Sequence, residues 1–145
     1  MKTLRPVSMQ RVRGALDTYH LDVEVAENGS WMVRTLTHVL TVGLEDSDIL
    51  HFKITSTRRF AGREALLRLR EHVNTRNQSN IGPKAYLERV GKTGFYTVSA
   101  EVSRLVRSGL SELQFSACTE ESVHMLYAFI TDLEAKLGEE GEVDA

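Results

Sequence analysis

Hydrophobic residues recur along the chain with two different spacings, and each spacing predicts one kind of element. Around Leu66, Leu69 and Val73, apolar side chains return every three or four residues, which is typical of a helix buried on one side. Residues 8–19 show the same spacing, as does a stripe near the C-terminus made of Leu126, Phe129, Leu133 and Leu137. That stripe follows the sequence SELQ at 111–114, which has capping-box spacing. We therefore expect three helices, of which the second ends within residues 74–83 and the third runs to about residue 137.

Other segments alternate apolar and polar residues at every second position, which is the period of a half-buried strand. These segments are 21–27, 31–36, 38–44, 49–55, 84–90 and 95–102. Asn28 with Gly29 and the GKTG sequence at 91–94 suit hairpin turns. No Gly or Pro divides 31–36 from 38–44, so either two strands or one long bent strand fits the pattern. In the last hairpin the expected inward side chains are Tyr86, Val90, Tyr96, Val98 and Val102.

The predicted element order, α-β-β-β-β-α-β-β-α, indicates an α+β fold. Short connections between successive strands force antiparallel pairing, and helices packed on one face of such a sheet complete the domain. The 145 residues fit a single domain. We expect it to span residues 1–138, followed by a flexible acidic tail at 139–145 that offers almost nothing to bury.

Composition narrows the class of protein. With 41% hydrophobic and 26% charged residues the chain is typical of a globular protein. No apolar stretch approaches the roughly 18 to 20 residues that cross a bilayer, and the N-terminus lacks the apolar core of a secretory signal. The single cysteine, Cys118, excludes an internal disulfide and fits a reducing compartment. We therefore expect a cytoplasmic protein without a membrane partner.

Positive charge is concentrated in one segment although the net charge of the chain is −2. Residues 58–76 contain six arginines and two glutamates, a local net charge of +4. Such a segment could bind an anion, a nucleic acid or an acidic protein segment, or it could form a solvated helix face. Binding of single-stranded nucleic acid favours aromatic side chains among the arginines, and Phe60, the one aromatic residue present, is expected in the core.

No pattern of catalytic or metal-binding residues is apparent. The five histidines never occur at i, i+4 on one helix, and Cys-x-x-Cys, Gly-x-Ser-x-Gly and the glycine patterns of nucleotide sites are absent. Cys118 lies in an apolar stripe with nothing nearby to lower its pKa. We therefore expect no enzymatic activity, no metal and no cofactor. Trp31, the one tryptophan, could either anchor the first hairpin or lie on a partner-binding surface.

A polar corner rich in asparagine joins the second helix to the following strand. Asn77 can bond to backbone groups that are free where a helix ends and a strand begins, and Pro83 fixes the direction in which the strand starts. A structural role explains this corner without a ligand, and a binding site is the alternative.

Five short sequences, taken in order, resemble the YbjN-domain family, nearest to its actinobacterial branch. They are TRRF at 57–60, NTRN at 74–77, PKAYLE at 83–88, AEV at 100–102 and GLSE at 109–112. Members are bacterial proteins described as sensory transduction regulators, and their fold is similar to that of type III secretion chaperones, which commonly form homodimers. The chain departs from the family at Arg76, where the family pattern Asn-x-Trp-Asn has tryptophan, and at Leu36 and Thr37, which replace a common Asp-Gly turn.

The resemblance implies a homodimeric, non-enzymatic protein-binding module that acts as a sensory transduction regulator or chaperone-like adaptor on an unknown partner protein. The candidate protein-binding residues are Trp31, Arg58, Arg59, Arg63, Asn74, Asn77 and Lys84. The alternative is a nucleic-acid-binding regulator that uses the basic segment 58–76, although the net charge and the lack of stacking aromatics oppose it.

Overall fold

The computed structural model describes residues 3–79 and 82–140. Three helices and six strands follow one another in the predicted order: α1 (Met9–Asp17), β1 (Val23–Val25), β2 (Trp31–Arg34), β3 (His38–Glu45), β4 (Ile49–Ser56), α2 (Arg63–Ser79), β5 (Lys84–Arg89), β6 (Tyr96–Leu105) and α3 (Glu112–Glu140). Within the described residues, no helix is both long enough and apolar enough to cross a membrane. α3 continues through residues 139 and 140, which the sequence assigned to the flexible acidic tail, and residues 141–145 of that tail lie outside the described residues.

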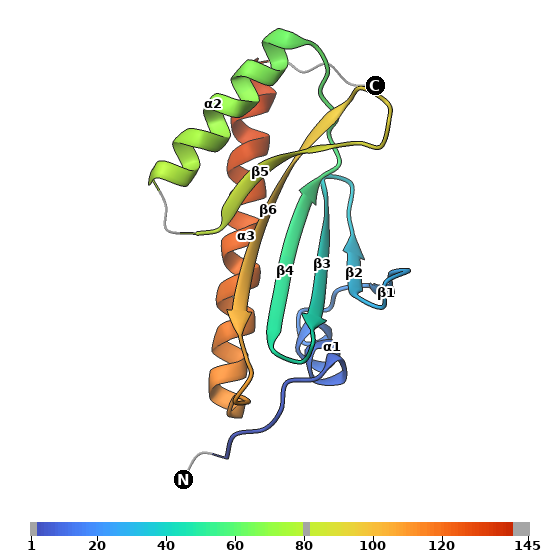
Figure 1. Cartoon of the computed structure of the whole chain (residues 1–145), viewed down its shortest axis with the longest axis vertical. Coiled ribbons are helices and arrows are strands. Elements are labelled where there is room, and N and C mark those ends of the chain that lie inside the picture. The colour runs from blue at the N-terminus through green and yellow to red at the C-terminus, as the bar shows by residue number, and fades with distance from the viewer. Residues whose placement is uncertain (1–2, 80–81, 141–145) are drawn as a thin grey trace.

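The six strands form one antiparallel sheet in the order β1-β2-β3-β4-β6-β5, which confirms the α+β prediction. Figure 1 shows α3 running along one face of this twisted sheet, with α2 beside it near β5 and α1 at the opposite end. β2 and β3 are separate paired strands, because Thr35 N–H donates to the His38 carbonyl (2.9 Å) and closes a tight turn between them. This turn contains neither Gly nor Pro, so the sequence alone could not decide between two strands and one long bent strand.

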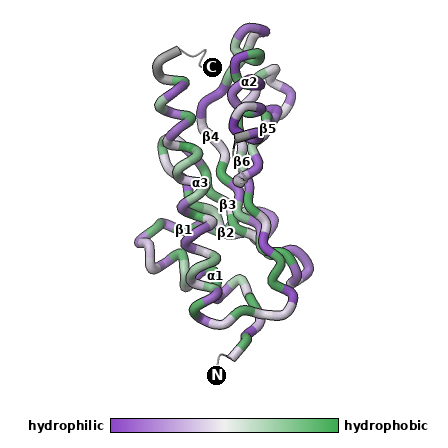
Figure 2. The backbone as a smooth tube through the Cα atoms, turned by 90° about the vertical axis from the view of Figure 1, so that its left-hand side faces the viewer, coloured by the Kyte–Doolittle hydropathy of each residue, from purple (hydrophilic) through white to green (hydrophobic). Residues whose placement is uncertain are grey.

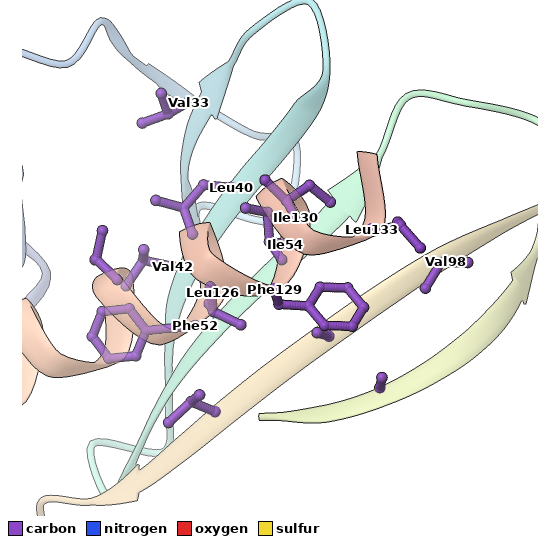
Figure 3. Close-up of a cluster of buried hydrophobic side chains, with 14 of the residues drawn as sticks. Val33, Leu40, Val42, Phe52, Ile54, Val98, Leu126, Phe129, Ile130 and Leu133 are labelled. Carbon is purple, nitrogen blue, oxygen red and sulfur yellow. The ribbon is translucent and has the colours of Figure 1, made fainter. Parts of the chain in front are cut away.

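The core lies between the sheet and α3. Every second residue of the two central strands is buried, and these side chains are Leu50, Phe52 and Ile54 from β4 with Val98, Ala100 and Val102 from β6. The α3 stripe predicted at Leu126, Phe129, Leu133 and Leu137 packs against them (Figure 3). Burial of a large apolar side chain contributes about 1.5–3 kcal/mol, so α3 and the central strands stabilise one another.

The predicted inward position of Tyr86 is wrong. Ala85 lies opposite Ala100 and Leu87 lies opposite Val98, so these two side chains point toward the core. Tyr86 lies opposite Ser99 on the other face of the sheet. Residues 85, 86 and 87 are all apolar or aromatic, so a period of two could not decide which face they occupy. Of the other inward predictions, Val98 and Val102 are buried, whereas Val90 and Tyr96 are only half-buried.

Two side chains fasten the N-terminal part of the chain to the rest of the molecule. The guanidinium of Arg11 donates to the carbonyls of Arg5 (2.9 Å) and Leu110 (2.8 Å) and lies 4.5 Å from the centre of the Phe115 ring. The indole N–H of Trp31 donates to the Met9 carbonyl (2.6 Å), so Trp31 anchors the first hairpin on α1. The packing role is therefore the one that the structure shows for Trp31.

His38 predicts a pH dependence of stability. Its ring lies against Tyr127 (5.1 Å between ring centres), and burial lowers its pKa below 6.5 although the charge of Glu134 opposes this shift. The unfolded chain therefore takes up this proton first as the pH falls, and the free energy of unfolding decreases as the pH drops below about 6.5.

We expect His38→Gln to make this acid-side decrease shallower. Urea denaturation of both proteins at a series of pH values between about 7 and 5 measures it, since one proton can change the slope by at most about 1.4 kcal/mol per pH unit. If the free energy of unfolding fell equally with decreasing pH in both proteins, the assignment to His38 would be wrong.

Candidate protein-binding surface

The three helices cover one face of the sheet, and the other face carries a polar network. Lys53 donates to one carboxylate oxygen of Glu88 (2.7 Å), and the hydroxyl of Ser99 donates to the other (2.8 Å). Thr55 bonds to Ser99 in turn (2.9 Å). Burial is the largest single influence and opposes the charge of Lys53, but the bond to Glu88, the charge of Glu88 and the nearby Tyr86 together outweigh it and raise the pKa of Lys53. Burial likewise opposes the charge of Glu88, and its bonds to Lys53 and Ser99 outweigh that effect and lower its pKa.

A shallow groove of about 670 Å³ lies over β3, β4 and β6 on this polar face. His51, in its wall, bonds to Glu45 (2.8 Å) and to Ser103 (2.8 Å) through its two ring nitrogens. Glu101 accepts a hydrogen bond from the Tyr86 hydroxyl (3.2 Å). Because these acids and bases already bond to one another, the groove is a surface with satisfied polar groups. Sequence reasoning missed this network, although polar residues at alternate positions of 51–55 and 99–103 were its signal.

In the ranges 3–79 and 82–140, no three His, Cys, Asp or Glu side chains are arranged to hold a metal ion. Burial raises the pKa of the Cys118 thiol, against the opposing charge of Arg104, so the reactive thiolate is disfavoured at neutral pH.

Two of the six arginines of segment 58–76 hold α2 and its preceding loop against α3. Arg58 binds both carboxylate oxygens of Glu134, at 3.0 and 2.9 Å from Nε. Arg76 donates to Asp132 (2.9 Å), and its guanidinium lies 5.2 Å from the centre of the Phe129 ring. The guanidinium of Arg58, a predicted protein-binding residue, is therefore engaged in packing within the chain.

The other four arginines of the segment are exposed. They are Arg59, Arg63, Arg68 and Arg70. None of the four forms an ion pair with any residue that the structure describes. Leu67, with 52% of its surface exposed, lies between Arg63 and Arg70 at i, i+4, i+7 spacing on one side of α2. Leu67 therefore has Arg63 and Arg70 on one side and Glu64 and Glu71 on the other side along the helix.

Asn77 closes part of the free edge of the sheet. Its amide NH₂ donates to the Ala85 carbonyl, and its amide oxygen accepts from the Ala85 N–H, both at 2.9 Å. α2 ends at Ser79, so Asn77 lies in its last turn and bonds to β5 as a neighbouring strand would. The structural role predicted for Asn77 is confirmed.

The structure gathers most of the candidate residues at one end of the molecule. Asn74, Asn77 and Arg63 belong to α2, Arg59 precedes it, and exposed Lys84 begins the adjacent strand β5. Trp31 is separated from this group, because β2 lies four places from β5 in the sheet. The candidate surface therefore consists of α2, the loop before it and β5.

Comparison with known families agrees with this architecture. The model of the YbjN family, described as "Putative bacterial sensory transduction regulator", matches residues 8–135. The chain belongs to the YbjN family. No curated protein matches the chain in sequence.

The YbjN fold is also seen in a solved structure. The crystal structure of YbjN from E. coli, described as "a putative transcription regulator", superposes with a TM-score of 0.74 at 17% sequence identity. The match covers 92% of this chain and 96% of that chain. At this identity the likeness shows a common fold, and the family description is that of a regulator.

The bonds of Asn77 generate a prediction with a matched control. We expect Asn77→Ala to lower the free energy of unfolding by about 1–2 kcal/mol relative to Asn74→Ala, because it removes two hydrogen bonds from a half-exposed edge. Both changes replace Asn by Ala in the same helix, so the gain in helix propensity cancels between them. Urea denaturation at equal protein concentration measures the difference, and equal stability of the two variants would show that the amide contributes nothing.

Proposed function

We propose that this YbjN-family protein is a non-enzymatic regulator that acts by binding another protein, and that an acidic segment of the partner docks along α2. The observation that carries the proposal is the set of four exposed arginines that have no ion pair within the described part of the chain. Arg59 and Arg63, candidate protein-binding residues from the sequence, keep that role, and Arg70 replaces Arg58 because Arg58 is bound to Glu134.

Electrostatics supports a partner of negative charge. The chain as a whole carries −2, so the arginines of α2 form a local field of opposite sign to the rest of the molecule. Such a field acts over about 8 Å at physiological salt, which is enough to orient a partner during encounter. Exposed Leu67 adds an apolar contact within this field, as a protein segment uses and a free anion does not.

The same surface argues against the alternative, a nucleic-acid-binding regulator. Phe60, the one aromatic side chain of segment 58–76, is 2% exposed and bonds through its backbone to Tyr96 (2.8 Å). It therefore cannot stack on bases, which sequence-tolerant binding of single strands uses for much of its affinity.

A charge-reversal experiment tests the docking surface. Tagged wild-type protein and the double variant Arg63→Glu/Arg70→Glu are compared in pull-downs from nuclease-treated native lysate, analysed by mass spectrometry. We expect capture of an acidic partner to fall at least about tenfold in the double variant, because both side chains then repel it. Arg107→Glu, an exposed reversal in the connection between β6 and α3, is the control. Equal capture by all three proteins, or capture that disappears with nuclease alone, would contradict the proposal.

We further propose that the protein is a homodimer, as the resemblance to secretion chaperones implies. Exposed Leu105 and Leu113, which flank the connection from β6 to α3, support the proposal because they offer apolar surface that a second copy can cover. Sedimentation velocity at micromolar concentration is expected to give about twice the chain mass of 16.3 kDa. A single species at the monomer mass over the whole concentration range would rule the dimer out.

A further inference from the structure

One side of β5 is not paired with another strand, and part of it remains open beyond Asn77. In an antiparallel ladder, the N–H and C=O groups of alternate residues point to opposite sides of the strand. Ala85 points away from β6, since Asn77 binds both of its backbone groups. Val90 points toward the partner strand, where its N–H donates to Phe95 (2.9 Å). Leu87 and Arg89 therefore point away from β6, as Ala85 does.

No described residue fills these positions. Within 3–79 and 82–140, no hydrogen bond outside the sheet joins the backbone of Leu87 or Arg89. The two residues together offer two donors and two acceptors in line, which is the template that an added strand uses. Asn77 marks one end of this template, because it already bonds to the backbone N–H and C=O groups of Ala85.

The flank of α2 that faces this edge is basic. β5 returns alongside α2 after the loop, and both views show the two elements adjacent (Figures 1 and 2). Side chains three and seven residues before Asn77 lie on the same flank of α2, about one and two turns back along the helix. These side chains are Asn74 and Arg70, and Arg63 follows two turns farther on the same flank.

The exposed charged side chains on the Asn77 flank of α2 and along the outer side of β5 are basic. Arg63, Arg70 and Arg89 are exposed and form no ion pair in the described part of the chain, and the same holds for Lys84 and Lys92. The nearest carboxylate of the strand, Glu88, lies on the polar face and is bound to Lys53. An occupant of this edge that carries carboxylates gains from every one of these side chains.

We propose that the β5 edge at residues 87–89 binds an extended, acidic segment of a partner protein as an added antiparallel strand. The proposal rests on the proposed function and specifies how the acidic segment docks. In an antiparallel hydrogen-bonded pair, directly opposite residues share a face, and Leu87 and Arg89 point toward the helix side. The partner residues that bond to them therefore also point toward α2, so acidic residues are expected at alternate positions of the segment.

This geometry is testable with synthetic peptides and the full-length protein. The probe is a fluorescein-labelled nine-residue peptide in which Glu alternates with Val, and binding is followed by fluorescence anisotropy. Two variants carry the same charge: one is N-methylated at the Glu residues, and the other at the Val residues. We expect methylation at Glu to weaken binding at least about tenfold, because these N–H groups face β5, and methylation at Val to leave it within about twofold. Equal affinities for all three peptides, or no binding of the parent peptide at millimolar concentration, would overturn strand addition.

Amide hydrogen exchange gives a second readout that locates the strand. With the parent peptide at saturation, the amides of Leu87 and Arg89 are expected to exchange at least about tenfold more slowly, while that of Glu88, which already faces β6, stays unchanged. Binding that Arg63→Glu/Arg70→Glu abolishes, but that leaves these two amides unprotected, would retain the proposed function and refute strand addition.

Protection in the absence of peptide would assign the edge to another occupant and refute the proposal. Protection that rises with protein concentration would indicate a second copy of the chain. Protection lost on truncation after Glu140 would indicate the chain's own acidic C-terminus.

Discussion

The structure depends on the packing of one long helix across the centre of one sheet face. α3 spans Glu112–Glu140 and buries Leu126, Phe129 and Leu133 against β4 and β6, which pair with each other at the middle of the sheet. The other two helices then take the space that remains: α1 lies at the β1 end, and α2 lies beside α3 near β5. Because all three helices lie on the same face, the fold leaves one face and both edges of the sheet without a helix across them.

The open face, the β1 edge and the β5 edge differ in how readily their polar groups can bond to another chain. The open face satisfies its own polar groups, since Lys53, Glu88 and Ser99 bond to one another across three strands. The β1 edge is only three residues long, which limits what can pair with it. The β5 edge is longer, and a single side chain, Asn77, occupies one of its positions by imitating a strand. The β5 edge, which lies near exposed arginines of α2, is thus the part of the sheet best suited to pair with another polypeptide.

Periodicity was enough to predict the elements and the core but not the surface. The stripe of α3 and the alternation of β4 are long, so burial leaves one solution, and Leu126, Phe129, Phe52 and Ile54 are buried as expected. Tyr86 was misplaced because three consecutive residues of β5 are apolar or aromatic, and only pairing with β6 decides their register. The roles of Arg58 and Arg59 could not be separated in the sequence, because Glu134, which binds Arg58, lies 76 residues farther along the chain.

The departure of this chain from the family pattern at residue 76 falls inside the molecule and not on the candidate surface. Arg76 lies at the contact between α2 and α3, where its planar guanidinium stacks on Phe129 and its charge is met by Asp132. A tryptophan in the family pattern would present a flat ring at the same contact, and a guanidinium on an aromatic face is the closest polar substitute. Arg76 therefore helps to hold α2 against α3, and with it Asn77 beside β5. The proposed mode of docking uses the backbone of β5 and not the side chain of residue 76, so it does not depend on which residue stands there.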